Sequence, residues 1–125
     1  MYRLFKILDM QKPLTPTAHS VLDYVLSGVQ IAAPGLLKLN NSAARTYQAL
    51  GAGYTLVNAL TDTGAGIKHL IPFKSHQKAD IGFLAGMSLL SAVSFIRKDK
   101  RALRFHLAFL AIGITHYLLT DYNGR

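Results

Sequence analysis

Long uncharged stretches alternate with short basic gaps along this chain. Four stretches contain no Asp, Glu, Lys or Arg, namely 24–37, 46–61, 81–96 and 105–120. A helix that crosses a membrane needs about 20 predominantly apolar residues, and each stretch approaches that length once the small residues and long basic side chains beside it are counted. A soluble helix would show a polar stripe along one face, which these stretches lack. The pattern predicts an all-α bundle of four transmembrane helices.

Helix-start signals divide this single membrane domain into three parts. Thr15 followed by Pro16 is a typical N-cap and first helical residue, and Asp99 is a capping residue before the last uncharged stretch. Residues 1–13 mix apolar and charged positions, which predicts a short interfacial helix rather than a signal peptide. After this interfacial segment we expect two tandem helical hairpins, at residues 15–64 and 72–124.

The two expected hairpins repeat the same polar motifs. His19 and Asp23 form an H-x-x-x-D pair near the start of the first hairpin, and His76 and Asp80 form the same pair 57 residues later. Each hairpin also ends with the tripeptide Leu-Thr-Asp, at 60–62 and 119–121. Four of the six acidic residues of the chain stand in these motifs, which indicates an internal duplication.

Tandem hairpins place both H-x-x-x-D motifs and both Leu-Thr-Asp ends on one membrane face, around a pseudo-two-fold axis along the membrane normal. Residues at positions i and i+4 share a helix face, so the His and Asp of each motif point the same way. Two imidazoles with four carboxylates are the ligand types of di-metal carboxylate bundles. The sequence therefore predicts a site for one or two divalent metal ions, Zn or Fe, with the ligands His19, Asp23, Asp62, His76, Asp80 and Asp121.

Two other interpretations of these two histidines and four aspartates stay open. Hydrogen bonds between the histidines and the aspartates could brace the two repeats in a non-catalytic membrane module. Alternatively, the carboxylates could carry protons or ions in a small transporter. His116 lies within the last uncharged stretch and could reach the cluster from one turn deeper. A metal-bound water would support a hydrolytic or redox reaction, but no motif identifies a catalytic residue or a substrate.

Composition and charge narrow the classes of function. The 125 residues carry 14 Lys and Arg against 6 acidic residues, all Asp, which gives a net charge of +8, and there is no Cys. Disorder is excluded by the 50% hydrophobic content and a disulfide scaffold by the absence of Cys. The 14 basic residues divide equally between the two membrane faces, so the positive-inside rule does not fix the orientation. We expect a lipid bilayer as the partner, with a homo-oligomer or another membrane protein beside it, and no nucleic acid.

The segment that begins at Asp23-Tyr24 carries a family resemblance. Gly28 and Ala33-Pro34-Gly35 follow it, then a hairpin and a second helix, and the whole unit is repeated once. In this the chain resembles the small bacterial SPW-repeat membrane proteins, which are duplicated two-helix units with an acidic residue near the start of each repeat. Ala33-Pro34-Gly35 stands where that family has Ser-Pro-Trp. The resemblance implies a bacterial inner-membrane protein, and it implies no particular activity.

Overall fold

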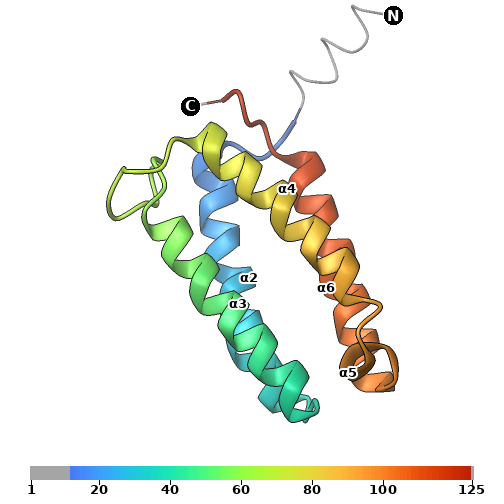
Figure 1. Ribbon diagram of the computed structural model, residues 1–125. Helices are drawn as coiled ribbons and strands as arrows, with labels where there is room; N and C mark the ends of the chain where they lie inside the picture. Colours follow the sequence, from blue (N-terminus) through green and yellow to red (C-terminus); the bar gives the residue numbers. More distant parts are fainter. Residues whose placement is uncertain (1–11, 125) are drawn as a thin grey trace, which may run out of the picture.

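The computed structural model describes residues 12–124, and over this range the chain is all-α, as predicted (Figure 1). Its helices are α2 (Pro16–Leu36), α3 (Asn41–Ala59), α4 (Phe73–Leu90), α5 (Ser94–Arg97) and α6 (Lys100–Leu119). The only β pairings among the described residues are two isolated bridges, Leu14 with Thr120 and Thr61 with Ile71. The interfacial helix predicted at residues 1–13 lies outside the described residues, apart from its last two positions.

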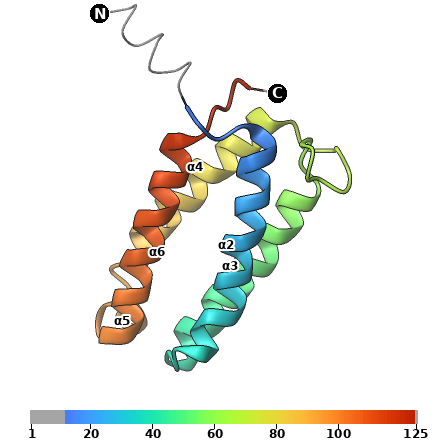
Figure 2. The same ribbon diagram turned by 180° about the vertical axis from the view of Figure 1, so that it is seen from behind.

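The four long helices run alternately in opposite directions, so α2 and α3 form one hairpin and α4 and α6 form another (Figures 1 and 2). The starts of α2 and α4 and the ends of α3 and α6 lie together at the top of Figure 1, which we call the upper end. The connections 37–40 and 91–99 lie at the opposite, lower end. Both H-x-x-x-D motifs therefore belong to the upper end.

Side chains cap three helices, and two of these caps, Thr15 and Asp99, are those expected from the sequence. Thr15 accepts a hydrogen bond from the Ala18 N–H at 3.1 Å, and Asn40 accepts one from the Ala43 N–H at 2.9 Å. Asp99 caps α6 by accepting from two backbone N–H groups, and it also accepts from the Asn40 side-chain amide at 2.8 Å. These hydrogen bonds, that from Asn40 foremost, hold the pKa of the partly exposed Asp99 carboxyl below its usual range.

The uncharged stretch 81–96 is not one continuous helix. Helix α4 ends at Leu90, and the short helix α5 follows after a turn. This break directs Ile96 into the interior, where its side chain is completely buried. The first hairpin packs more simply, because Gly51 lets α3 approach α2 closely: a Cβ there would lie only 2.9 Å from the Gln30 Cβ and the Ser27 carbonyl oxygen.

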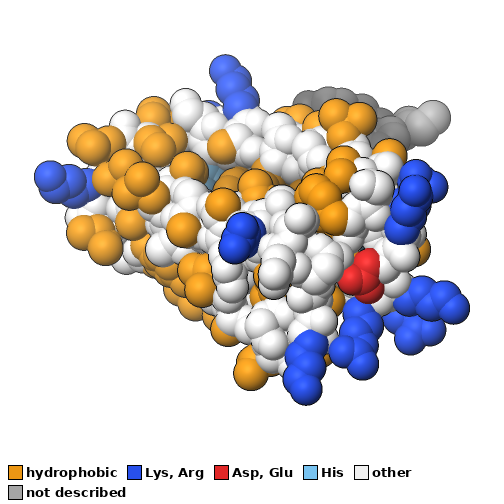
Figure 3. Space-filling view, turned by 60° about the horizontal axis from the view of Figure 1, so that its bottom comes forward, with side chains coloured by type: hydrophobic (Ala, Val, Ile, Leu, Met, Phe, Trp, Pro, Cys, Tyr) orange, Lys and Arg blue, Asp and Glu red, His pale blue; other side chains and the backbone are white. Residues whose placement is uncertain are grey.

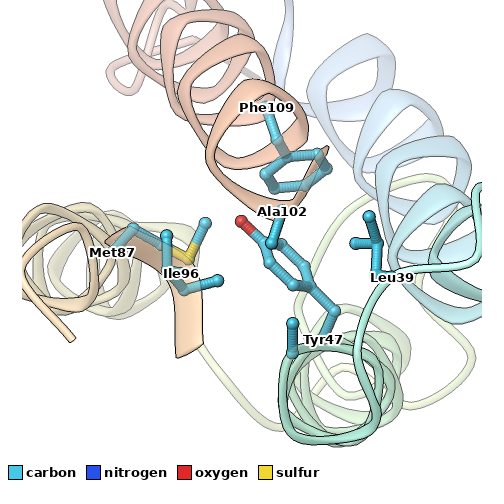
Figure 4. Packing of buried hydrophobic residues seen from close by; sticks show 7 residues of the cluster. Leu39, Tyr47, Met87, Ile96, Ala102 and Phe109 are labelled. Carbon is cyan, nitrogen blue, oxygen red and sulfur yellow. The ribbon is translucent and has the colours of Figure 1, made fainter. Parts of the chain in front are cut away.

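The buried hydrophobic core lies towards the lower end and is small. Figure 4 shows Tyr47 of α3 pointing towards Ala102 and Phe109 of α6, with Met87 of α4 and Ile96 of α5 beside it. Many other fully buried side chains are polar, including His19, His76, His106, Gln30, Asn58, Thr61 and Thr120. The interior is therefore unusually rich in hydrogen-bonding groups.

The outer surface shows the opposite composition. Large apolar side chains are exposed on every long helix, most of them on α2 and α6; Leu36 is 82% exposed, Leu89 77% and Leu118 61%. Figure 3 shows hydrophobic side chains gathered over one side of the visible face, with lysine and arginine side chains projecting mostly at its margins. Among the described helices, α6 alone is both long and apolar enough to cross a membrane. The four-span arrangement thus stays a prediction.

Candidate metal centre

Two helix starts bring four predicted ligands together at the upper end. Helix α2 supplies His19 and Asp23 from its first two turns, and α4 supplies His76 and Asp80 in the same way. The i, i+4 spacing puts both side chains of each pair on one helix face, and these faces of α2 and α4 are directed towards each other. All four side chains are buried, and one ligand atom from each can be chosen so that the four atoms lie within 4.8 Å of one another. We call these four residues the His/Asp cluster from here on.

The Nε2 atoms of both histidines face both carboxylates. Nε2 of His76 lies 2.9 Å from Oδ2 of Asp23 and 3.3 Å from Oδ1 of Asp80. Nε2 of His19 lies 3.1 Å from Oδ2 of Asp23 and 3.1 Å from Oδ2 of Asp80. Yet Nε2 of His19 does not have hydrogen-bond geometry with either oxygen, although it is fully buried. This nitrogen therefore points between the two carboxylates rather than at one of them.

Two threonines fix the orientation of the two imidazoles. Nδ1 of His19 lies 2.7 Å from the Thr120 hydroxyl, and Nδ1 of His76 lies 2.8 Å from the Thr61 hydroxyl. Each hydroxyl has one proton and donates it to the backbone carbonyl four residues earlier in the chain. Nδ1 must therefore be the donor to the threonine, so in the neutral ring Nε2 carries the lone pair. Both histidines thus turn Nε2 towards the cluster. Because a carboxylate oxygen can only accept, Nε2 is the donor in the hydrogen bond from His76 to Oδ2 of Asp23, and it offers a lone pair to a metal ion only when that proton is lost.

A ring of donors surrounds the two carboxylates. The imidazole of His116 donates from Nε2 to Oδ1 of Asp23 at 2.9 Å. The hydroxyl of Tyr122 donates to Oδ2 of Asp80 at 2.6 Å, and the Tyr54 hydroxyl donates to its Oδ1. Because these donors fix both carboxylates from outside the cluster, the oxygens that face the histidines are held in place.

The contacts at the upper end occur in matching pairs. The bridge between Leu14 and Thr120 corresponds to the bridge between Ile71 and Thr61, because Ile71 and Thr120 stand 57 and 59 residues after their counterparts. In the same way His19 bonds to the threonine of the second hairpin, and His76 bonds to the threonine of the first. Such pairing is what a two-fold relation between the hairpins produces.

The structure places Asp62 and Asp121 outside the His/Asp cluster, contrary to the expectation from the sequence. The Asp62 carboxylate is 61% exposed and bonds to the ring of His69 at 2.6 Å. The Asp121 carboxylate accepts from the Asn123 N–H within its own turn. Helices α3 and α6 end before the Leu-Thr-Asp tripeptides are complete, and successive side chains of an extended segment point to opposite sides. The threonines point inward, so the aspartates point away.

Sequence reasoning missed several residues that hold the cluster. It weighed His116 as a secondary member, and His116 does reach Asp23. It overlooked Thr61 and Thr120, although both belong to the repeated Leu-Thr-Asp tripeptide and were visible there. The tyrosines at positions 54 and 122 belong to no repeated motif, so only the tertiary structure reveals them.

Comparisons with known proteins add no further assignment. No family model, no curated protein and no solved structure matches this chain. The resemblance to the SPW-repeat proteins therefore stays an expectation from the sequence. What the structure does provide is a buried group of two histidines and two aspartates that could hold a metal ion.

Proposed function

We propose that this protein is a small membrane protein that binds one divalent metal ion between its two hairpins. The ligands are Nε2 of His19, Nε2 of His76 and one oxygen each of Asp23 and Asp80. The observation that carries the proposal is the orientation of the two imidazoles: threonines hold Nδ1, so both Nε2 atoms face two buried carboxylates. A histidine that donates its other nitrogen to an outer partner is the usual arrangement at a metal.

The spacing of the ligand atoms supports this assignment. Zn bonds to His nitrogen and carboxylate oxygen at about 2.0–2.2 Å, so neighbouring ligand atoms around one ion lie about 2.9–3.5 Å apart. The four close nitrogen–oxygen distances in the cluster run from 2.9 to 3.3 Å. One ligand atom from each of the four residues lies within 4.8 Å of the others, so these atoms would move closer together around an ion. Mixed nitrogen and oxygen ligands suit Zn or Fe.

Charge balance supports a divalent rather than a monovalent ion. Two ionised carboxylates buried between helices carry a large desolvation cost unless positive charge compensates them. Their described partners are histidines and tyrosines. One divalent ion with two neutral imidazoles makes the site electrically neutral. Two protonated imidazoles would also do so, and this is the metal-free brace with which the proposal competes.

The distribution of apolar side chains supports the bilayer. A soluble monomer rarely exposes a contiguous apolar patch larger than a few hundred Å², whereas here many valines, leucines and isoleucines are exposed, most of them on α2 and α6. The residues that lower the hydropathy of α2, His19, Asp23 and Gln30, are all buried between the helices. Outward-facing positions are therefore more apolar than the average composition of α2 indicates, as expected for a helix surrounded by lipid.

Metal analysis of the detergent-purified protein tests the proposal. We expect about one Zn or Fe per chain after loading, and loss of that metal in the double variant Asp23→Asn/Asp80→Asn. The matched control is Asp62→Asn/Asp121→Asn, which removes the same number of carboxylates from outside the cluster and should bind metal like the wild type. A wild-type protein that binds no metal, or equal metal in both double variants, contradicts the proposal.

A thermal melt covers the case in which Asp23→Asn/Asp80→Asn does not fold. Ligands that bind only the native state stabilise it by about 2.7 kcal/mol at a hundred times their dissociation constant. We therefore expect a chelator to lower the melting temperature of the wild type and added Zn to restore it. If the cluster is only a hydrogen-bonded brace, the chelator will leave the melting temperature unchanged.

A further inference from the structure

A cavity adjoins the His/Asp cluster inside the helix bundle. Its volume is about 40 Å³, and three cluster residues, His19, Asp23 and Asp80, form part of its wall. Leucine and phenylalanine side chains line much of the remainder, and Ser27 and Gln30 of α2 add polar groups. About 10–15 Å³ is enough for one water molecule by this kind of measure, so the cavity has room for about three. An aromatic ring is too large for it.

Gln30 indicates that this cavity is wet. The side-chain nitrogen of Gln30 is buried and has no hydrogen-bond partner among the described residues, although the side chain lines the cavity. A buried amide donor without a partner is strongly disfavoured. Asp23, Ser27 and Gln30 follow one another at i, i+4 and i+7 on one face of α2, over a rise of about 10 Å. Three water molecules in a row cover most of that distance.

We propose that the metal ion keeps one coordination position facing this cavity, and that a small anion can replace the water bound there. This inference rests on the proposed function and adds the class of ligand: an anion of up to three heavy atoms, such as azide or formate. Three points support it. Three of the four metal ligands line the cavity, its volume admits only molecules of this size, and Gln30 offers a donor to the water behind the ligand.

Cobalt provides the readout, because the visible absorption of Co²⁺ changes when a ligand is added or exchanged. We expect azide and formate to alter the spectrum of the Co²⁺-loaded wild type in a saturable manner, and benzoate to leave it unchanged. The variant Ser27→Leu fills the cavity beside Asp23, so it should bind Co²⁺ but bind azide at least about tenfold more weakly. Gln30→Leu removes one hydrogen bond to the bound water and should weaken azide binding about fivefold.

Met87→Leu is the matched control. Met87 is buried, lies on α4 at the position equivalent to Gln30, and does not line the cavity. The Met87→Leu variant should bind azide as the wild type does. If the wild type binds Co²⁺ but azide leaves its spectrum unchanged, or if azide acts equally on wild type, Ser27→Leu and Gln30→Leu, the inference is overturned and the metal site stands. If the wild type binds no Co²⁺, the proposed function fails and the inference fails with it.

Discussion

Two buried histidine networks join the hairpins, one at each end of the molecule, and they differ in the partners of the two ring nitrogens. At the lower end His106 donates from Nε2 to the Met87 carbonyl at 2.9 Å, because a carbonyl can only accept. Its Nδ1 therefore accepts from the Tyr47 hydroxyl, 2.6 Å away. At the upper end the threonine hydroxyls accept a hydrogen bond from Nδ1 instead, and the Nε2 atoms face carboxylates.

This difference separates a structural contact from a candidate binding site. The His106 network contains no carboxylate, and its ring nitrogens both have partners, so a neutral imidazole satisfies it completely. The His/Asp cluster contains two carboxylates and a His19 nitrogen without hydrogen-bond geometry. Buried polar groups that are fully satisfied need nothing further, whereas an incompletely satisfied group calls for an explanation. Histidines are buried at both ends, so burial alone would not have distinguished the structural contact from the candidate binding site.

Disruption of the His/Asp cluster at the upper end should have the largest effect on stability. Asp23→Ala removes the acceptor that faces His19, His76 and His116 at once. Removing one partner of a buried ion pair costs about 3–5 kcal/mol, so we expect a loss of that size in the free energy of unfolding in detergent. A loss below about 1 kcal/mol would show that the cluster carries no buried charge.

The threonine contacts test whether imidazole orientation matters for metal binding. Thr61→Val and Thr120→Val keep the side-chain shape but remove the partner of Nδ1. Loss of such an outer partner typically lowers metal affinity about 10–100-fold, and we expect this range in a competition titration with a chelator. Thr115→Val is the control, because the Thr115 hydroxyl makes the same bond to the carbonyl four residues earlier and shares no described hydrogen bond with a histidine ring. Equal effects of all three variants would exclude the orienting role.

The lower network should affect stability without affecting the metal. Tyr47→Phe leaves Nδ1 of the buried His106 without a partner, which costs about 1–3 kcal/mol. We therefore expect a lower melting temperature with an unchanged metal content per chain. A loss of metal in Tyr47→Phe would mean that the His106 network and the His/Asp cluster are coupled, and would contradict their separate roles.

The smallest effect should come from Asp99 at the lower end. Its pKa is lowered in the folded protein, so its contribution to stability is present above the unfolded-state pKa of about 3.9 and is lost as the pH falls through the folded-state value. Wild type should therefore lose slightly more stability than Asp99→Asn on acidification below about pH 4. Melting temperatures measured across that range will show parallel curves if the capping carboxylate contributes nothing.

The sequence by itself determined the helices, the cap residues and the nearness of the two H-x-x-x-D motifs. These follow from local rules: Thr15 and Asp99 cap a helix wherever it starts, and i, i+4 spacing puts His19 beside Asp23 in any helix. The alternating direction of the helices then brought His76 and Asp80 to the same end of the molecule.

Only the tertiary structure decided which motif residues face inward. Helices α3 and α6 end one or two residues before Thr61 and Thr120, and this directs the threonines to the histidines and Asp62 and Asp121 away from them. A shift of one residue in an extended segment reverses the side that a side chain faces, and no repeat pattern fixes that shift. The Tyr54 and Tyr122 contacts likewise depend on packing between helices that are distant in sequence.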